Sequence, residues 1–385
     1  MAALRYILVG DGLSPHLLKW ARALHEVAGE QLALGVVSSR GLLPEFDRLV
    51  PPERRLLLNT QPQHAGGNSA VLRHLPRVAS WLRAQQPQVL HAHYLTSHGT
   101  LAWLSQRVWR VPGLLVSSAW GSDVLLTPQR SLAARWLTQA VLKASAVCTA
   151  DSRHMAREML RLGAREVDVF PFGLLQCPPE PAPGSKDPNL FFSNRGLEPL
   201  YRIDLVLHLF AAVAEANAKA RLIVANEGSE RQSLQALAHR LGVDARVTFT
   251  GLLRPAEQAR WYERAQWHLS LPQSDSVSVS VLEAMAHGCI PVLSDLPANR
   301  ELVTHTLTGW VLQAPAESPD SARAESSGWE ASVPPFIRAM PELLQRAPDI
   351  AAANREWVLR HGLFPVQVHR FLRGLPLGAG ALPLP

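Results

Sequence analysis

Short apolar runs alternate with segments of helical spacing along almost the whole chain, and this alternation restricts the fold more than any other feature of the sequence. Residues 6–9, 32–37 and 114–118 are such runs in the first half, and residues 190–193 and 247–250 continue the pattern in the second. Each run has the length of a buried strand. A repeated strand–helix order builds parallel sheets covered by helices on both faces. The sequence therefore predicts an α/β protein with doubly wound, Rossmann-like sheets.

A proline-rich segment, GLLQCPPEPAPGSKDP, interrupts the alternation once and has the composition of a linker. The chain has 385 residues, which exceeds the usual size of one domain and favours two. We predict an N-terminal domain over 1–172, a linker over 173–188, a C-terminal domain over 189–360, a further helix within 361–375 and a tail over 376–385.

The composition is that of a folded protein, with 47% hydrophobic and 18% charged residues. A net charge of +6 suits acidic partners such as nucleotides or an anionic membrane, but an arginine-rich solvated surface explains it equally well. Cys148, Cys177 and Cys289 form neither a metal-binding spacing nor a disulfide framework. The sequence shows no signal-peptide pattern and no run long enough to span a bilayer. We expect a cytoplasmic protein that is either free in solution or peripheral on the inner membrane face.

Two features of the first half are candidates for ligand contact. Gly10-Asp11-Gly12 follows the first run, and Gly12 either lets the backbone approach a ligand or is an ordinary turn glycine. The third glycine of the dinucleotide-binding fingerprint is missing, which argues against an NAD site. His93 ends the apolar run 89–93, and the carboxyl ends of parallel strands face the ligand crevice. His93 is thus either a donor to a hydroxyl or phosphate or a satisfied structural histidine.

The second half carries groups suited to a sugar nucleotide. Arg195 and Arg202 follow the run 190–193, where cations can neutralise a diphosphate. Gly251 and Leu252 follow another run and could line a base.

The stretch 270–301 reads SLPQSDSVSVSVLEAMAHGCIPVLSDLPANRE, a strand, a loop, a helix and a second strand. The helix begins near Ser278 and Val279, so backbone N–H groups and the positive end of the helix dipole form an anion site there. Asp275 precedes the helix and Glu283 lies within it, eight residues later. Asp275 can accept hydroxyls of a sugar ring, and Glu283 can accept two ribose hydroxyls. Alternatively, Ser280-x-x-Glu283 is a capping box in which Glu283 only caps its own helix.

The segment SDSVSVSVLEAMAHGCIPVLSDLPANRE resembles the signature of the retaining glycosyltransferases of family 4, in which two acidic residues eight apart mark the donor site. These residues fall on Asp275 and Glu283. Less specific likenesses occur in VLHAHYLTSHG at 89–99, SSAWGSDV at 117–124, TADSRHMAREML at 149–160, SNRGLEPLYRIDLVL at 193–207 and VTFTGLL at 247–253. The resemblance covers most of residues 1–312.

The resemblance implies the GT-B architecture, two facing Rossmann-like domains with a crevice between them. The C-terminal domain would hold a UDP-, GDP- or ADP-sugar, and the N-terminal domain a glycan, lipid-linked or small acceptor. The last helices would cross back onto the N-terminal domain. A hexosyl group would be transferred with retention of configuration. The residues that would take part in catalysis are Asp275, Arg195 and His93. The residues that would bind the donor are Glu283, Arg202, Gly12, Gly251, Leu252, Ser278 and Val279.

No Asp-x-Asp pair that could hold a metal ion to a diphosphate occurs in the sequence. Arginines and the helix dipole are therefore expected to stabilise the leaving group, without a metal ion or other cofactor. No nucleic-acid recognition motif accompanies the positive charge, so we expect no nucleic-acid partner. Tryptophan and arginine interleave in 101–110, and the next helical segment is also basic. That pattern suits either an anionic membrane surface or an ordinary helix packed on a sheet.

Four features depart from the family pattern. Asp275 stands where the first acidic residue is usually Glu, Ser276-Val277-Ser278 replaces the usual Gly-Phe-Gly, Tyr201 stands where a basic residue is frequent, and Trp120 stands where many members have histidine. These departures bear on the sugar preference, and Asp275 and Trp120 keep open a sugar-nucleotide-binding protein with impaired catalysis. A sugar-nucleotide epimerase of the same architecture is a second alternative, against which the acidic pair argues.

Overall fold

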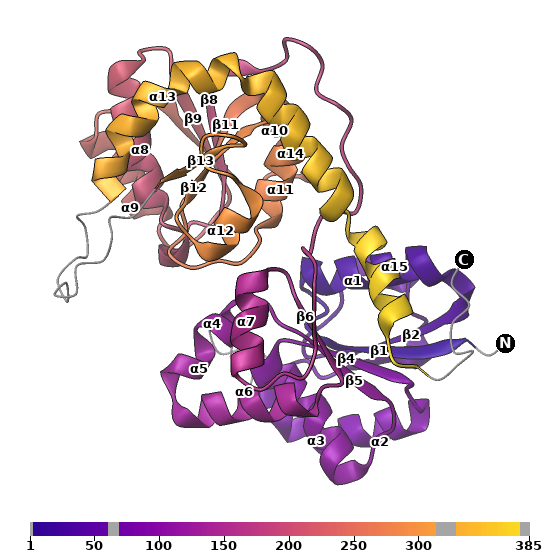
Figure 1. Cartoon of the computed structure of the whole chain (residues 1–385). Helices are drawn as coiled ribbons and strands as arrows, with labels where there is room; N and C mark the ends of the chain where they lie inside the picture. Colours follow the sequence, from indigo (N-terminus) through magenta and orange to yellow (C-terminus); the bar gives the residue numbers. More distant parts are fainter. Residues whose placement is uncertain (1–2, 61–68, 313–328, 378–385) are drawn as a thin grey trace. The chain divides into compact units, whose positions relative to one another are not determined.

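The computed structural model describes residues 3–60, 69–312 and 329–377. The chain divides into two compact units, residues 1–175 together with the segment that begins at Leu363, and residues 176–362 (Figure 1). The first division lies close to the start of the predicted linker over 173–188, so most of that linker belongs to the second unit. The second division lies close to the end of the predicted C-terminal domain over 189–360. Of the predicted tail, only the part up to Leu377 lies within the described residues.

The N-terminal unit is built on a parallel sheet, which in the described residues has seven strands in the order β3-β2-β1-β4-β5-β6-β7. All neighbouring pairs are parallel, with Tyr6 of the first strand opposite Leu34 and Val89 of its two neighbours. The strands are β1 (Leu4–Gly10), β2 (Leu32–Ser38), β3 (Arg55–Leu57), β4 (Val89–His93), β5 (Leu114–Ser118), β6 (Val147–Ala150) and β7 (Val167–Val169).

Serine caps begin three helices of this unit, because the hydroxyls of Ser14, Ser131 and Ser152 accept from backbone N–H groups of the first turn. Successive residues of β1 point to opposite faces of the sheet, so Tyr6 and Ile7 belong to different core clusters. The helices are α1 (Pro15–Ala28), α2 (Leu75–Gln85), α3 (Thr100–Trp109), α4 (Ser122–Leu125), α5 (Thr127–Arg130), α6 (Leu132–Ala144), α7 (Arg153–Arg161) and α15 (Phe364–Gly374).

The last helix of the chain, α15, is part of the N-terminal unit. Phe364 and Phe371 are 0% and 1% exposed, and their rings lie 4.9 and 5.7 Å from the ring of Trp20 on α1. At the first residue of α15, the N–H of Phe364 donates to the carbonyl of Leu174 at 2.8 Å. The helix within the predicted range 361–375 is therefore held to this unit by aromatic packing and by a backbone hydrogen bond.

The C-terminal unit is built on a second parallel sheet, with six strands in the described residues in the order β10-β9-β8-β11-β12-β13. The strands are β8 (Asp187–Asn194), β9 (Arg221–Ala225), β10 (Val247–Gly251), β11 (Ala265–Ser270), β12 (Ile290–Ser294) and β13 (Trp310–Leu312). The helices are α8 (Ile203–Ala216), α9 (Arg231–Arg240), α10 (Pro255–Arg264), α11 (Val279–Ala286), α12 (Pro297–Leu302), α13 (Val333–Gln345) and α14 (Ala347–His361).

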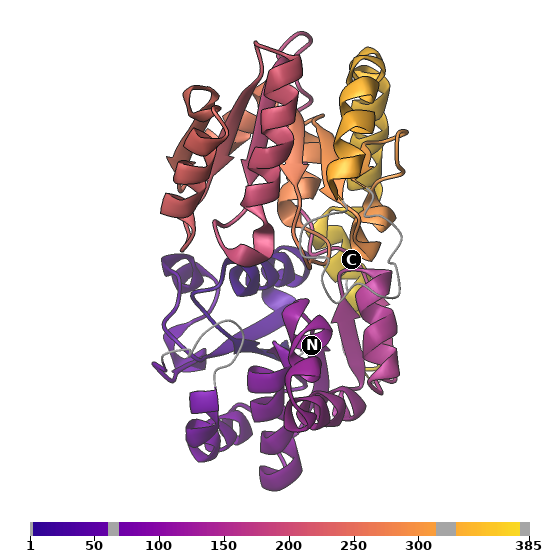
Figure 2. The same ribbon diagram turned by 90° about the vertical axis from the view of Figure 1, so that its left-hand side faces the viewer.

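Each face of this second sheet has its own core. Phe191 and Trp267 stack at 5.7 Å on the face that packs against α8, α9 and α13. Phe192 and Ile223 point to the opposite face, where they pack with Tyr262 of α10 and Ala284 of α11. Helices cover both faces of the sheet, as Figure 1 and the turned view in Figure 2 show. The prediction of doubly wound α/β sheets is confirmed.

The boundary between the last two helices of this unit does not fall at the proline inside the first of them. Pro341 lies within α13, and the chain breaks only after Gln345, before α14. The new helix begins with Ala347 and Pro348, and proline is well tolerated in a first turn, where its missing N–H would have no partner inside the helix.

Candidate active site

The donor-side residues lie at the carboxyl edge of the second sheet. Strands β8 and β11 are neighbours, with Trp267 opposite Phe191 and His268 opposite Phe192. Because parallel neighbours end at the same edge, the residues that follow β8 meet the loop between β11 and α11. This topology brings Arg195 to Asp275 although 80 positions separate them in the sequence.

The guanidinium of Arg195 is held by several side chains. Its Nη2 donates to Oδ2 of Asp275 at 2.6 Å, and its Nη1 donates to the hydroxyl of Ser278 and, at 3.4 Å, to that of Ser280. The Cζ atom lies 4.5 Å from the centre of the Tyr201 ring. The side chain of Arg195 is only 10% exposed and that of Asp275 23%. The cation is thus fixed in place, and Tyr201 supports its flat face.

Helix α11 begins without a side-chain cap. Ser278 occupies the N-cap position with an extended backbone, but its hydroxyl is hydrogen-bonded to Arg195 and, at 2.8 Å, to Ser280 instead of to the first turn. Val279 is the first helical residue. The serine that normally caps such a helix therefore helps to anchor the arginine, and the positive end of the helix dipole lies beside that arginine.

The capping-box alternative for Glu283 is wrong. With Ser278 at the N-cap, the third helical residue is Val281 and Glu283 lies two positions further on, out of the place that a capping box requires. The carboxylate instead accepts from Nε2 of Gln258 on α10 at 2.6 Å. Burial and, to a smaller extent, the charge of Glu283 raise the pKa of Tyr262, also on α10, well above its usual value.

Arg202 is paired locally and is not part of the Arg195 cluster. It precedes α8 with φ of 49°, and its Nε and Nη2 donate to Asp204 at 3.0 and 2.9 Å. The adjacent residue, Tyr201, is the one that reaches Arg195. The sequence indicated Tyr201 only as a departure from the family pattern, and its contact with the arginine was not foreseen.

Gly251 and Leu252 lie at the end of β10. Gly251 has φ of +75°, and an added Cβ would come within 2.7 Å of Oε1 of Glu227, so the position needs glycine. Leu252 is 74% exposed, which leaves its side chain accessible on the surface after β10. The backbone of Gly251 has a structural explanation, and contact of Leu252 with a base stays a prediction.

Gly12 has no room for a side chain. An added Cβ would lie 2.4 Å from Cδ2 of Leu42 and 2.6 Å from the carbonyl oxygen of Gly41. Its N–H donates to the hydroxyl of Ser38 at 2.8 Å. Close packing of the loops that follow β1 and β2 therefore accounts for this glycine, and a ligand contact at Gly12 stays a prediction.

His93 ends β4, as expected, but its side chain is buried. It is 3% exposed, and its ring centre lies 4.2 Å from that of His91 and 5.7 Å from those of Trp20 and Trp120. Burial, followed by the neighbouring histidines, lowers the pKa of His93 well below its usual value, so the ring is neutral at pH 7. Within the described residues neither ring nitrogen has a hydrogen-bond partner. A direct role requires that Trp120 or another neighbour move.

Asp123 connects the loops after β4 and β5. Its two carboxylate oxygens accept from the N–H groups of Leu95, at 2.9 Å, and Trp120, at 2.8 Å. The residue is 0% exposed, so in this conformation it holds the loops that carry His93 and Trp120 and does not contact solvent.

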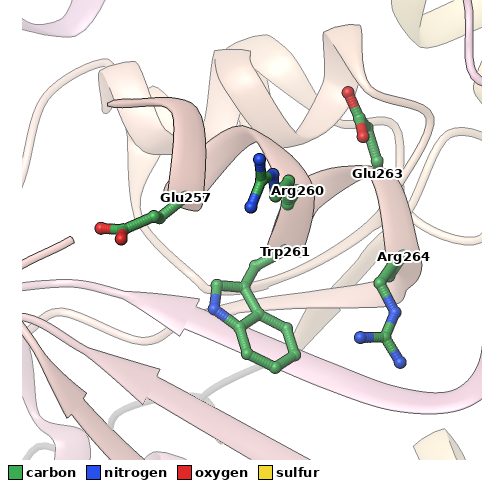
Figure 3. Close-up of a pocket in the computed structure, with 5 residues that line it drawn as sticks. All are labelled: Glu257, Arg260, Trp261, Glu263 and Arg264. Carbon is green, nitrogen blue, oxygen red and sulfur yellow. The ribbon is translucent and has the colours of Figure 1, made fainter. Parts of the chain in front are cut away.

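A separate pocket lies on the surface of α10 (Figure 3). None of the predicted site residues lines it. The lining residues are Glu257, Arg260, Trp261, Glu263 and Arg264. The guanidinium of Arg264 lies 5.5 Å from the centre of the Trp261 ring.

Metal-binding clusters and membrane-spanning helices are both absent from the part of the chain that the structure describes. Within residues 3–60, 69–312 and 329–377, no group of three or more histidine, cysteine, aspartate or glutamate side chains could hold a metal ion. In the same part of the chain no helix is both long enough and apolar enough to cross a membrane.

Sequence-family models match both halves of the chain. The model described as "Glycosyl transferase 4-like domain" matches residues 11–173, and the model described as "Glycosyl transferases group 1" matches residues 180–326. Each match falls within one of the two structural units.

A curated relative matches part of the chain. The alpha-monoglucosyldiacylglycerol synthase of Streptococcus pneumoniae is 30% identical over 129 residues, which are 31% of this chain and 29% of that protein. The alignment thus spans less than a third of the length of this relative.

Solved structures match the whole chain. The Anabaena protein HepE in complex with UDP has a TM-score of 0.71 at 15% identity and covers 97% of this chain and 100% of its own. The pneumococcal O-GlcNAc transferase GtfA in complex with UDP and GlcNAc has a TM-score of 0.73 at 8% identity and covers 97% of this chain and 98% of its own. These likenesses concern the fold, and they confirm the prediction of two Rossmann-like domains of the GT-B type.

Proposed function

Because this chain belongs to the GT-B glycosyltransferases, we propose that it transfers a sugar from a nucleoside diphosphate sugar to an acceptor with retention of configuration. The donor is a UDP-, GDP- or ADP-sugar, and the acceptor is a glycan, a lipid-linked oligosaccharide or a small molecule. UDP-sugars are the first donors to test, since HepE and GtfA were both solved with UDP.

The observation that carries this proposal is the arginine at the start of α11. Arg195 is nearly buried, is oriented by Asp275 and Ser278, and lies beside the positive end of a helix. A fixed guanidinium next to exposed ends of helix dipoles is a strong site for phosphate oxygens. Glu283 lies further along the same helix. Its carboxylate would bind the ribose of the nucleotide by accepting hydrogen bonds from the ribose hydroxyls.

The proposed reaction breaks the bond between the anomeric carbon and the diphosphate oxygen, which leaves with the electron pair. The acceptor oxygen forms its bond to the same carbon on the same face, and its proton passes to the departing phosphate oxygen. Negative charge grows on the diphosphate in the transition state, so Arg195 and the N-terminus of α11 stabilise the transition state more than the ground state. Asp275 orients Arg195 and accepts hydroxyls of the transferred sugar.

The remaining predicted residues take supporting roles in this proposal. Ser278 and Val279 offer the start of α11 to the diphosphate, and Leu252 contacts the base while Gly251 shapes that turn. Arg202 adds positive charge near α8 while it stays paired with Asp204. In the N-terminal unit, Gly12 contributes to binding of the donor and His93 to catalysis. No metal ion or cofactor takes part in the proposed reaction.

Membrane contact is proposed for the N-terminal unit. Leu132 and Trp136 of α6 are 87% and 60% exposed, and Val108 of the neighbouring α3 is 58% exposed. The ring of Trp136 lies 6.0 Å from that of Trp103 on α3. Exposed apolar side chains among arginines suit an anionic membrane surface. A peripheral contact there would favour a lipid-linked acceptor.

The test is to incubate the purified protein with UDP-, GDP- and ADP-sugars while recording the release of nucleoside diphosphate and the thermal shift. A ligand at 100 times its dissociation constant adds about 2.7 kcal/mol of stability. Release of the diphosphate supports a transferase. A stabilising shift without release indicates a binding protein with impaired catalysis, and conversion of the donor to an isomer indicates an epimerase. If none of these donors binds, the proposed function is wrong.

A further inference from the structure

Glu283 is held from a neighbouring helix. Nε2 of Gln258 donates to its Oε2 at 2.6 Å. Tyr262 lies four residues after Gln258 on α10 and therefore on the same face of that helix. The hydroxyl of Tyr262 donates to the backbone of α11 at Ser280, whereas Gln258 donates to the carboxylate itself and orients it.

The amide of Gln258 is a neutral donor. It forms a hydrogen bond with the carboxylate without pairing it with a cation, as a lysine or arginine in the same place would. A carboxylate whose plane is fixed in this way is a preorganised acceptor for hydroxyl groups.

Tyr262 is itself fixed. It is 1% exposed, its ring lies 4.9 Å from that of Phe192, and its hydroxyl donates to the carbonyl of Ser280 at 3.1 Å. Gln258 is only half-buried and extends from the first turns of α10. Of the two donors, Gln258 is therefore the one that can be changed with little effect on the core.

We propose that Gln258 is a positioning residue for recognition of the nucleotide ribose, because it holds Glu283 in the orientation that accepts the ribose hydroxyls. This inference rests on the proposed function, in which Glu283 reads the ribose. It assigns to α10, rather than to α11 alone, the selection of ribonucleotides over deoxyribonucleotides.

The start of α10 does not depend on Gln258. Pro255 stands in the first turn, and Arg254 and Glu257 form a capping pair in which the N–H of Arg254 donates to Glu257 at 3.0 Å. Substitution of Gln258 by leucine therefore removes the donor and keeps the helix start.

The experiment compares Gln258→Leu with the wild-type chain by calorimetric titration with UDP, GDP and ADP and with their 2′-deoxy and 3′-deoxy forms. We expect the wild-type chain to prefer the ribonucleotide by about tenfold, and this preference to fall about fivefold in the variant, which is the scale of one hydrogen bond. Affinity for the deoxy forms should stay the same. Gln235→Leu, an exposed position on α9, makes the same chemical change and should alter neither affinity.

Other outcomes overturn the inference. An equal loss of affinity for ribo and deoxy forms means that Gln258 only supports the fold, and a gain in affinity for the ribonucleotide means that its amide competes with the ribose. An unchanged preference in Gln258→Leu contradicts positioning from α10. Binding without any ribose preference in the wild-type chain refutes the role of Glu283 as well, whereas absence of all nucleotide binding refutes the proposed function itself.

Discussion

Arg195 depends on its neighbours for both position and charge balance. Asp275 offsets the positive charge, Ser278 and Ser280 accept hydrogen bonds, and Tyr201 covers the flat face of the guanidinium. In the proposed function a diphosphate adds negative charge beside Asp275, so the arginine would serve two anionic groups at once. A guanidinium can do so because its donors point in several directions within one plane.

Replacement of Arg195 by alanine should therefore slow turnover more than it weakens donor binding. We expect kcat for the preferred donor to fall about 10²–10³-fold, the usual effect of removing a group that stabilises a developing oxyanion. Steady-state kinetics on Arg195→Ala and Arg195→Lys measure this, and the lysine variant should recover part of the rate because it keeps the charge without the planar fork. A kcat within twofold of the wild-type value in the alanine variant contradicts the role.

His98 should contribute to the pH dependence of stability. Burial lowers its pKa to about 4, and its Nδ1 pairs with the carbonyl of His93 at 2.8 Å. Because this pKa lies below the 6.5 of an unfolded histidine, the unfolded chain binds the proton first. The stabilising effect is complete above pH 6.5 and is lost as the pH falls toward 4.

Between pH 7.5 and 5 this single residue should reduce the free energy of unfolding by about 2 kcal/mol. His98→Asn removes the titrating ring and keeps a donor near the Nδ1 position. Urea denaturation at the two pH values should show a smaller loss of stability in the variant than in the wild-type chain. An identical loss in both proteins would mean that His98 does not carry this effect.

At the scale of elements, two parts of the fold are proposed to contact ligands: the start of α11, and the outer faces of α3 and α6. The N-cap serine of α11 binds Arg195 rather than its own helix. This arrangement forgoes about 1 kcal/mol of capping stability and leaves the backbone N–H groups at the helix start able to bind an anion.

On α6, Leu132 and Trp136 are exposed to a degree that packing within the described residues does not explain.

The apolar face of α6 should bind anionic vesicles. We expect the protein to co-sediment with phosphatidylglycerol vesicles at low salt, and Leu132→Ser with Trp136→Ser to reduce the bound fraction about tenfold, since both apolar insertion and charge contribute. Leu160→Ser is the matched control, because Leu160 is 50% exposed on α7. No binding of the wild-type chain, or equal binding by all variants, contradicts a membrane contact at α6.

At the scale of the whole molecule, the chain joins its two units twice, once after Leu175 and once before Leu363. The second connection returns α15 to the N-terminal unit, where Phe371 is 1% exposed and lies 5.7 Å from Trp20 and 6.0 Å from Phe170. The N-terminal unit therefore completes its core with residues that follow the whole C-terminal unit in sequence.

Phe371→Ala should destabilise the N-terminal unit by about 3–5 kcal/mol, through lost burial and the cavity left behind. Thermal unfolding followed by calorimetry measures this loss of stability. The control is Val366→Ala, because Val366 is 55% exposed on the same helix. The nucleotide affinity of the C-terminal unit should stay the same at temperatures where the variant is folded. A loss of stability below 1 kcal/mol would show that α15 is not part of the cooperative core of this unit.

Local sequence pattern determined the class of the fold and part of the site. Apolar runs of strand length, the helical spacing between them and the proline-rich interruption predicted two doubly wound units, because these signals act within one element and its nearest turns. Asp275 and Glu283 likewise lie within one loop and one helix, so the family resemblance of this short segment is enough to indicate both residues as candidates.

Tertiary structure alone decided which side chains meet. Arg202, predicted to serve the donor, pairs with Asp204, whereas Tyr201 covers Arg195 and Gln258 orients Glu283 from another helix. His93 ends its strand as predicted, yet the surrounding aromatic rings bury it. Such contacts depend on strand order and on the packing of whole helices. Side chains that are distant in sequence are brought together by the sheet, and a spacing pattern within one element carries no information about them.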